Sequence, residues 1–513
     1  MVVRPGGGGW GAANSERRGV NATKRRRSSG KESLMHVKYH NLREWLNQVE
    51  SMGGLRKVEG ATAEEDAGRI AEMLAHTEDA PAVLMDAIPG CPKGHRLLIN
   101  ANGAKSRIAH TLGFDPAIEN FALVESISQR LQDLQLIPPV VVETGPVMEN
   151  TQKGAEVDLS VYPAPIWHPE DGQRYIGTGC YLITRDPEEG WINVGTYRVM
   201  LEGKNQVGFY VSPGHHGRLH REKYFAKGQP CPVAVVLGGD PLLMIAGSLE
   251  VPWGVSEYDW AGGLRGGSYD VINDPVTGLP IPAEAELVLV GHAHADQKAP
   301  EGPFGEWTGY YASGSREEPF IHVERVYSRN NPIILGTPPN RPPFEADKYR
   351  QFIKSAMLLN DLRKAGVPGV KAVWCHGIGG CRLLIAVAIE QRYAGHVSQV
   401  GHLASQLPAG AYLGRFVVVT DDDIDISNLE ELWWAVITRC DPATDLDIIH
   451  QAWSGPLDPL IHPEAKAKGE YFNSRLIVNA AKPWSWRHQF PKALGPDREY
   501  RRKTREKWGH LLN

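Results

Sequence analysis

The sequence predicts a multidomain protein of mixed α+β and α/β class. Three observations predict it. At about 150 residues per domain, 513 residues allow about three domains. Short β-rich runs broken by glycine and proline fill residues 140–330, and apolar strands alternate with helices beyond them. Hydrophobic residues make up 42% and charged residues 22% of the chain, which excludes a largely disordered or collagen-like protein.

Shifts in composition divide the chain into five expected parts. They are a disordered basic tail (1–34), an N-terminal small α/β unit (35–140), a mostly antiparallel sheet or split β-barrel (141–335), a proline-rich linker (336–343) and a C-terminal α/β domain with a terminal helix (344–513).

The basic tail differs from the rest of the chain in charge. Residues 1–34 hold eight Lys and Arg against two Asp and Glu, which leaves 47 against 58, a net charge of −11, for the remainder. Met35 is the expected functional start of translation, and a targeting or polyanion-binding tail is the alternative. An acidic body excludes nucleic-acid binding outside the tail.

The N-terminal unit is expected to begin with two helices. Apolar residues from Leu42 to Met52 recur at helical spacing, and a glycine pair ends the pattern. A second helix is expected from Thr62, with Glu65 closing a capping box. Strands are predicted at 82–85 and 97–99 in this unit, at 140–142, 181–184, 207–211, 233–237 and 287–290 in the middle, and at 371–374, 383–388 and 416–420 near the end.

Two absences in the sequence narrow the location of the protein. No run approaches the 18 or so apolar residues of a membrane span, and no signal peptide is recognisable, so a soluble, cytoplasmic protein is expected. The six cysteines include no CxxC pair, which favours reduced thiols over a zinc or disulfide framework.

The closing basic amphipathic helix, 497–512, is of a kind that docks onto a partner subunit.

The segment WINVGTYR, residues 191–198, contains a candidate ligand pair. Asn193 and Arg198 are an odd number of residues apart, so both reach one ligand only if the strand kinks, and Gly195 is the place for a kink. Arg198 would then bind a carboxylate or phosphate. The alternative is a surface arginine on an edge strand.

Two further segments offer metal-binding side chains. SPGHHGRLH, residues 212–220, places His215 and His216 on a glycine-flanked turn, and AGSLEVPWGVSE, residues 246–257, ends in Glu257. One amide oxygen (Asn193), one imidazole (His216) and one carboxylate suit Mg²⁺ or Mn²⁺ completed by phosphate. A solvated loop carboxylate is the alternative for Glu257. The helical zinc-hydrolase pattern lacks its glutamate.

The segment EGPFGEWTGYY, residues 301–311, contains two carboxylates on a tight turn. The aromatic neighbours of Glu301 and Glu306 favour a raised carboxyl pKa, and thus a proton donor beside an ionised partner. Solvated glutamates are the alternative. GHAHAD, residues 291–296, gives a competing hypothesis, a metal-dependent hydrolase that uses His292 and His294, although no second His/Asp set accompanies them.

The order and spacing of these motifs resemble the UbiD family of prenylated-FMN-dependent (de)carboxylases, of the ferulic acid and 4-hydroxybenzoate decarboxylase type. NVGTYR, the His215-His216 pair, Glu257 and EGPFGE carry the resemblance, and RFVVVTDDDIDISNLEELWWAVITRCDP, residues 415–442, extends it. It implies a split β-barrel that binds the flavin and a C-terminal domain that forms oligomers.

The resemblance also implies a cofactor site. Its divalent ion, Mn²⁺ or Mg²⁺, would be held by Asn193, His216 and Glu257, and K⁺ by Glu257 with carbonyls among Trp191, Ala246, Ser248 and Leu249. The implied cofactor contacts are Asn193, Thr196, Tyr197, Arg198, His215, His216, Ser248, Leu249, Glu257 and Arg415. Arg415 stands where the family commonly has a lysine for the phosphate.

The implied reaction is reversible, non-oxidative decarboxylation of an aromatic, heteroaromatic or α,β-unsaturated acid, with release of CO₂. Arg198, held by Glu301, would orient the substrate, and Glu306 would protonate the carbon that loses CO₂. The resemblance implies a homodimer or homohexamer supplied by a flavin prenyltransferase. The hydrolase hypothesis remains one alternative, and a flavin-binding protein without decarboxylase activity is another.

Overall fold

The computed structural model describes residues 37–312, 314–494 and 498–512. The expected tail, 1–34, and Met35 lie outside the described residues. The described residues form one compact unit. None of the helices within the described ranges is long and apolar enough to cross a membrane.

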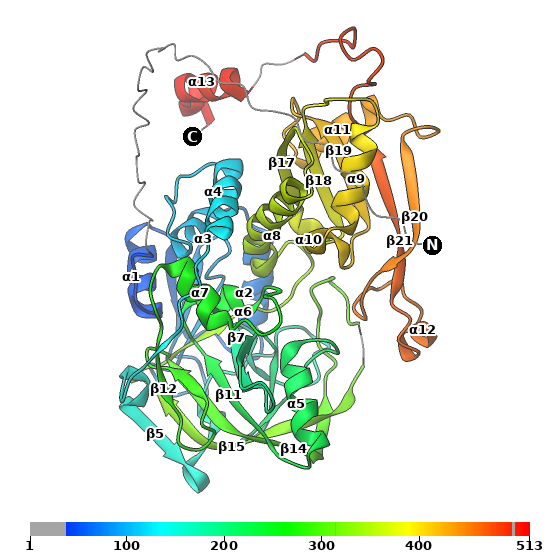
Figure 1. The fold of residues 1–513 in the computed structure, drawn as a ribbon. Coiled ribbons are helices and arrows are strands. Elements are labelled where there is room, and N and C mark those ends of the chain that lie inside the picture. The colour runs from blue at the N-terminus through cyan, green and yellow to red at the C-terminus, as the bar shows by residue number, and fades with distance from the viewer. Residues whose placement is uncertain (1–36, 313, 495–497, 513) are drawn as a thin grey trace, which may run out of the picture. The chain divides into compact units, whose positions relative to one another are not determined.

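Helices and strands are mixed in the first and last parts of the chain, whereas strands predominate between residues 140 and 336 (Figure 1). The helices are α1 (Leu42–Ser51), α2 (Asp66–Ala75), α3 (Lys105–Thr111), α4 (Asn120–Gln132), α5 (His216–Ala226), α6 (Pro241–Gly247), α7 (Glu257–Arg265), α8 (Glu345–Lys364), α9 (His396–Gln406), α10 (Pro408–Ala411), α11 (Leu429–Arg439), α12 (Pro463–Ala467) and α13 (Arg498–Trp508). The strands are β1 (Leu55–Glu59), β2 (Ala82–Asp86), β3 (Arg96–Ile99), β4 (Val140–Val141), β5 (Asn150–Lys153), β6 (Tyr175–Gly177), β7 (Cys180–Arg185), β8 (Ile192–Gly195), β9 (Val199–Gly203), β10 (Gln206–Gly208), β11 (Cys231–Leu237), β12 (Asp270–Asn273), β13 (Pro280–Pro282), β14 (Leu287–Glu301), β15 (Arg316–Ser328), β16 (Ile333–Gly336), β17 (Val370–Cys375), β18 (Leu384–Ile389), β19 (Phe416–Asp421), β20 (Leu446–Trp453) and β21 (Phe472–Asn479).

The two expected N-terminal helices are present, and the second starts later than predicted. Asn41 caps α1, which ends before Gly53 at a positive φ of 73°. Helix α2 begins at Asp66, and the Thr62 hydroxyl accepts hydrogen bonds from the Glu65 and Asp66 amides. The carboxylate that returns to the Thr62 amide belongs to Asp66 rather than Glu65, because the turn is one residue longer.

The first sheet recruits a strand from far along the chain. Its order is β1-β2-β3-β16, and β16 pairs in parallel with β3. The expected boundary at 335 and 336 therefore cuts through a strand of the N-terminal sheet. Sequence alone gives no sign of this, because a short apolar run such as 333–336 does not reveal its partner.

The middle of the chain forms a nine-stranded sheet in which neighbouring strands run antiparallel, as expected. Its path is β6-β9-β10-β15-β14-β11-β7-β8, with β5 paired to β15. Strand β14 is much longer than the predicted 287–290. Glu301 consequently ends a strand, whereas the sequence placed it on a turn with Glu306.

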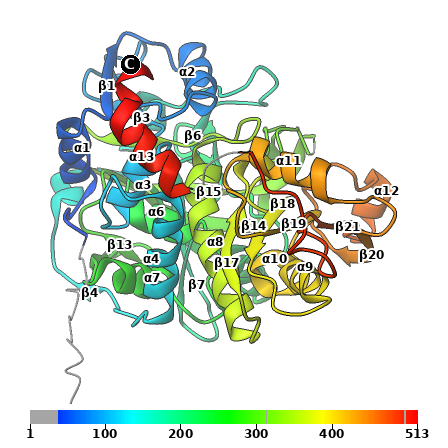
Figure 2. The same cartoon turned by 90° about the horizontal axis from the view of Figure 1, so that it is seen from above.

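The last sheet is mixed, in the order β17-β18-β19-β21-β20, with parallel pairs in its centre. Helix α8 lies between α4 and β17, as Figure 2 shows from above. The expected terminal helix is α13 followed by a 3-10 turn over 509–512. The alternation predicted after residue 343 is thus present.

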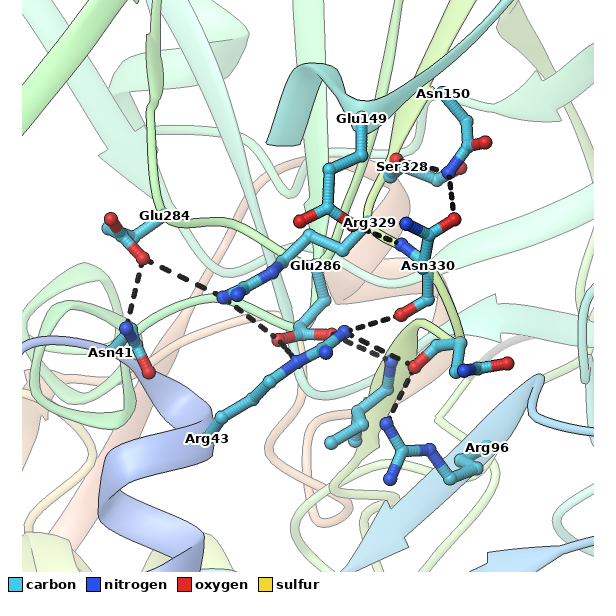
Figure 3. A network of polar contacts seen from close by, with 12 residues as sticks. Asn41, Arg43, Arg96, Glu149, Asn150, Glu284, Glu286, Ser328, Arg329 and Asn330 are labelled. Carbon is cyan, nitrogen blue, oxygen red and sulfur yellow. Dashed lines mark hydrogen bonds and ion pairs between the residues drawn. The ribbon is translucent and has the colours of Figure 1, made fainter. Parts of the chain in front are cut away.

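A buried carboxylate joins the N-terminal helix to the central sheet (Figure 3). Arg43 of α1 donates two hydrogen bonds of 2.8 Å to the Glu286 carboxylate, whose side chain has no exposed surface. The Arg329 guanidinium lies 3.6 Å from the same carboxylate, and the Ile333 amide donates to it over 3.2 Å. This network fixes α1 against the start of β14 and of β16.

Substitution Arg43→Ala is expected to lower the free energy of unfolding by about 2 kcal/mol, because it leaves a buried carboxylate with one partner fewer. This expected loss is smaller than for a fully buried ion pair, because the Arg43 side chain is partly exposed to water. Urea unfolding followed by tryptophan fluorescence measures the change. The matched control is Arg69→Ala, which breaks an exposed pair with Glu65 and should cost about 0.5 kcal/mol or less.

Candidate active site

Strand β8 brings the predicted metal ligands towards one another. It packs between α5, which begins at His216, and α7, which begins at Glu257. The Glu257 carboxylate accepts a hydrogen bond of 2.6 Å from the Val194 amide, next to Asn193. Asn193 is itself buried, and its Nδ2 atom has no hydrogen-bond partner.

Glu257 is a buried acid without a protein cation. Its exposed fraction is 3%, and among the described residues no Lys, Arg or His is found to act on its charge. Burial raises its pKa to about 7. A buried carboxylate is costly unless a positive charge compensates it, so the position suits a bound cation.

The Tyr197 hydroxyl connects this strand to α5. It accepts a hydrogen bond from the Gly217 amide over 3.2 Å. A Cβ atom at Gly195 would lie 2.3 Å from that hydroxyl, which explains the glycine. The kink expected there is a break, because β8 ends at Gly195 and β9 starts at Val199. Arg198 lies in the break and thus escapes the strict alternation of a strand.

The histidine pair lies at the start of α5. His216 is its first residue, and its ring lies 5.2 Å from the rings of both Trp191 and Trp253 in edge-on geometry. Burial lowers the pKa of His216, which favours the neutral imidazole that binds metals. His220, one turn later, instead faces Thr184 across 3.0 Å.

The predicted acid network is assembled around one guanidinium. Arg198 donates to both oxygens of Glu301, over 2.8 Å from Nε and 2.9 Å from Nη2, and its Nη1 donates to Glu306 over 2.7 Å. The guanidinium lies 4.3 Å from the centre of the Tyr210 ring and 5.2 Å from that of Phe304. Side chains from β14, the following turn and the break after β8 therefore meet here.

The electrostatics of the two carboxyls differ. Burial raises the pKa of Glu306, and the charge of Glu301 adds to this effect, although Arg198 acts against it. Burial also disfavours the charge of Arg198, but the two carboxylates outweigh it and raise the pKa of the guanidinium. Glu301 accepts two hydrogen bonds from Arg198, whereas Glu306 accepts one.

A cavity of about 220 Å³ opens beside this network. Five of the expected site residues line it, namely Thr196, Tyr197, Arg198, His215 and Glu306. Asn193, His216, Ser248, Leu249, Glu257, Glu301 and Arg415 do not form its wall. Arg198 and Glu306 of the acid network thus line the cavity, whereas Glu301 and the expected metal ligands do not.

Sequence reasoning missed the half of the wall that comes from the C-terminal part of the chain. Arg350 of α8, Arg382, Tyr412 and Leu457 line the cavity, and the Arg382 guanidinium lies 5.3 Å from the centre of the Trp307 ring. Arg382 is paired with Glu250, which follows Ser248 and Leu249, over 2.8 Å. The one signal for Arg382 was the glycine-rich segment 377–380 before it, because such segments often approach ligands.

Arg415 has a different partner from the one expected. One of its nitrogens lies 2.7 Å from both oxygens of the buried Asp458. The arginines that line the cavity are Arg198, Arg350 and Arg382, within the described ranges. The Nε atoms of Arg350 and Arg382 are buried without a hydrogen-bond partner, which fits them to an anionic ligand.

The carbonyls expected around potassium are engaged within the protein. Ser248 O accepts a hydrogen bond from Arg350, Ala246 O from the Leu249 amide, and Leu249 O from the Val251 amide. A potassium ion at Ser248 would face the arginine charge. A carbonyl oxygen has two lone pairs, so one hydrogen bond leaves room for an ion, and the potassium site stays a prediction.

The competing histidine motif lies elsewhere. His292 is on β14 and pairs with Glu324 over 2.6 Å. Across the described residues, no group of three or more His, Cys, Asp or Glu side chains could hold a metal ion. No observation here favours the hydrolase hypothesis.

Comparison with known families agrees with the geometry of the site. The 3-octaprenyl-4-hydroxybenzoate carboxy-lyase Rift-related domain matches residues 140–342, and the C-terminal domain of the same enzyme matches residues 349–480. The chain belongs to the UbiD family. The expected family and enzyme class, a prenylated-FMN-dependent carboxy-lyase, are confirmed.

Similar proteins of this family are decarboxylases. A phenolic acid decarboxylase of Streptomyces sp. is 32% identical over 87% of this chain and 92% of its own length. A pyrrole-2-carboxylic acid decarboxylase of Pseudomonas aeruginosa is 30% identical over 84% of this chain and 89% of its own.

Solved UbiD-class structures share the fold. The vanillic acid decarboxylase of Sedimentibacter hydroxybenzoicus in its open form has a TM-score of 0.80 at 28% identity, over 93% of this chain and 100% of its own. HmfF of Pelotomaculum thermopropionicum, in complex with FMN, has a TM-score of 0.79 at 25% identity, over 90% and 98%. A multidomain fold of mixed α/β content is therefore established.

Substitution Gly195→Ala is expected to destabilise the protein by about 1–3 kcal/mol, since the new Cβ must displace the Tyr197 hydroxyl from the Gly217 amide. The control is Gly203→Ala, whose Cβ would meet nothing closer than 3.6 Å. Thermal unfolding of both variants measures the difference. Equal midpoints would show that Tyr197 moves aside without cost.

Proposed function

We propose that this protein catalyses reversible decarboxylation of an aromatic or heteroaromatic carboxylic acid, or of an α,β-unsaturated one, with prenylated FMN. The observation that carries the proposal is the Arg198 guanidinium bridging Glu301 and Glu306 at the wall of a cavity. The decarboxylases of aromatic acids among its relatives support it.

The prenylated flavin would supply the electron sink that loss of CO₂ from an sp² carbon requires. The chain itself supplies position and charge. Arg198 presents its guanidinium to the cavity, where it can orient a substrate carboxylate. The bidentate contact with Glu301 keeps that guanidinium from rotating.

Glu306 is assigned the proton transfer. Glu306 lines the cavity, and burial raises its pKa, so at a given pH the protonated acid is more populated there than for an ordinary glutamate. That proton can pass to the carbon that has lost CO₂. In the direction of carboxylation, the same carboxylate accepts the proton.

Three of the expected site residues that do not line the cavity fit the divalent ion. Asn193, His216 and Glu257 would hold Mn²⁺ or Mg²⁺, since one amide, one neutral imidazole and one uncompensated carboxylate are suitable ligands. The ion would neutralise the anionic end of the cofactor. No step is assigned to potassium.

Cofactor contacts are proposed for Thr196, Tyr197 and His215 at the wall and for Ser248 and Leu249 behind it. Arg350 and Arg382 are added as candidate partners of an anionic group. Arg415 is less suited, because Asp458 compensates its charge.

The expected partners are a flavin prenyltransferase, which would supply the cofactor, and further copies of the chain. Exposed apolar side chains on the C-terminal sheet and α11 support assembly into a homodimer or homohexamer; they include Trp433, Ile437, Ile448 and Trp453. The split β-barrel and a cytoplasmic location remain part of the proposal.

Substitution Glu306→Gln is expected to lower kcat by 100-fold or more, because the amide keeps the shape but cannot donate the proton, with a factor of about 10²–10⁴ typical of such catalysis. The assay is CO₂ release over a panel of aromatic acids, after co-expression with a flavin prenyltransferase. The wild-type rate should fall as pH rises, since the donor is lost above its raised pKa.

Glu317→Gln, on an exposed position of β15, is the matched control and should keep the wild-type rate. Full activity of Glu306→Gln with bound cofactor would contradict the assigned role. A colourless wild-type protein without CO₂ release on any acid would contradict the function itself.

Substitution Asn193→Ala is expected to reduce bound manganese at least tenfold, because it removes one of three proposed ligands. Metal content per chain, measured by mass spectrometry after purification with and without a chelator, reports this directly. Asn47→Ala, on the exposed face of α1, is the control. Unchanged manganese in Asn193→Ala would remove Asn193 from the site.

A further inference from the structure

The loop before β6 lies against the turn that carries Glu306. The Gly172 amide donates a hydrogen bond of 2.8 Å to Pro303 O. A Cβ atom at Gly172 would lie 2.2 Å from Gly302 O, so the two backbones touch without room for a side chain. The position of the Glu306 turn is therefore sensitive to this loop.

A buried carboxylate ties the two segments together. Asp171, whose side chain has no exposed surface, accepts a hydrogen bond of 3.3 Å from the amide of Gly305, the residue before Glu306. It also accepts one of 3.0 Å from the His168 amide. Asp171 thus stabilises the turn that contains it and also holds the turn that carries Glu306.

The His168 ring bridges this pair of segments to a third. Its Nδ1 lies 3.2 Å from Asp171 Oδ2, and its Nε2 lies 3.2 Å from Asn340 Oδ1 in the proline-rich connector. Both neighbours are oxygen acceptors. A neutral imidazole carries one N–H and satisfies one of them, whereas an imidazolium donates to both.

The same ring packs against the turn. A Cβ atom at Gly305 would lie 3.0 Å from His168 Nδ1, and the Phe304 ring stands edge-on at 6.2 Å. Phe304 in turn lies beneath the Arg198 guanidinium at 5.2 Å. Contacts therefore run from His168 through the turn to the arginine that binds Glu306.

We propose that His168, as an imidazolium between Asp171 and Asn340, is a positioning residue that holds the Glu306 turn against Arg198 and the connector. It is absent from the cavity wall and so acts through the turn rather than on the substrate. This inference rests on the proposed role of Glu306 as proton donor.

The surroundings of His168 give the expected pH dependence. Asp171 on its own loop, Asn340 and the Pro339 carbonyl in the connector, and the edge of the Tyr311 ring face it. Burial lowers the pKa of His168, but Asp171 and the connector outweigh burial, and the net pKa is raised. The contribution of the imidazolium is present at low pH and is lost as pH rises through that raised pKa.

The test compares pH profiles of kcat in the cofactor-loaded enzyme. His168→Gln should lower kcat about tenfold at neutral pH with KM and flavin content unchanged, because a loosened turn misplaces the donor. In the wild type, deprotonation of His168 contributes to the fall of kcat at alkaline pH. This contribution should be absent from the variant. His402→Gln, an exposed histidine of α9, is the matched control and should keep the wild-type profile.

A second variant strengthens the contacts of the His168 ring instead of removing them. Asn340→Asp places a second carboxylate on the imidazolium, so the alkaline limb should move upward by about one pH unit with kcat retained. The ¹⁵N signals of His168 in the cofactor-free protein should titrate above 6.5 in the wild type and higher still in this variant.

A folded His168→Gln variant with the wild-type kcat and pH profile would overturn the proposal. An Asn340→Asp variant in which the alkaline limb of the pH profile stays at the wild-type pH would also overturn it. If His168→Gln fails to fold, Asn340→Asp and the histidine titration decide. Glu306→Gln in the same assay separates failure of the proposed function from failure of the inference about His168. An active Glu306→Gln would sink the proposed function, whereas an inactive one beside a wild-type-like His168→Gln would sink this inference alone.

Discussion

The buried charge of Arg198 is the constraint on which the site depends. A guanidinium out of water must be compensated, and here two carboxylates and two aromatic faces compensate it together. Removing either acid would leave charge unbalanced in a low-dielectric setting. The break after β8, the end of β14 and the turn after it must therefore keep fixed positions, and the nine-stranded sheet provides that rigidity.

The backbones of the two carboxylates beside Arg198 are held in different ways. Glu301 ends a long paired strand, while Glu306 lies on a turn that depends on contacts from other segments. An acid that only compensates charge benefits from a fixed position. An acid that donates a proton must be held at the right distance from the reacting carbon, so the contacts from neighbouring segments matter for Glu306.

Much of the site could be predicted because its residues lie in short, compositionally unusual segments. The order of Asn193, Arg198, His216, Glu257 and Glu306 was visible in the sequence, and so was the antiparallel character of the middle sheet. The C-terminal wall was not, because Arg350 and Tyr412 sit in ordinary helical and loop sequence whose approach to the cavity is decided by tertiary packing. The same holds for Arg415, because the sequence shows its positive charge but does not show that it pairs with Asp458.

The late strand β16 has a consequence for how the chain assembles on the ribosome. The N-terminal sheet needs Ile333–Gly336 beside β3, so its outer edge stays unpaired until synthesis has passed the whole nine-stranded sheet. An unpaired strand edge is a template for unwanted association. The nascent N-terminal unit is therefore a natural client for chaperones, and its completion waits for the segment that also begins the connector.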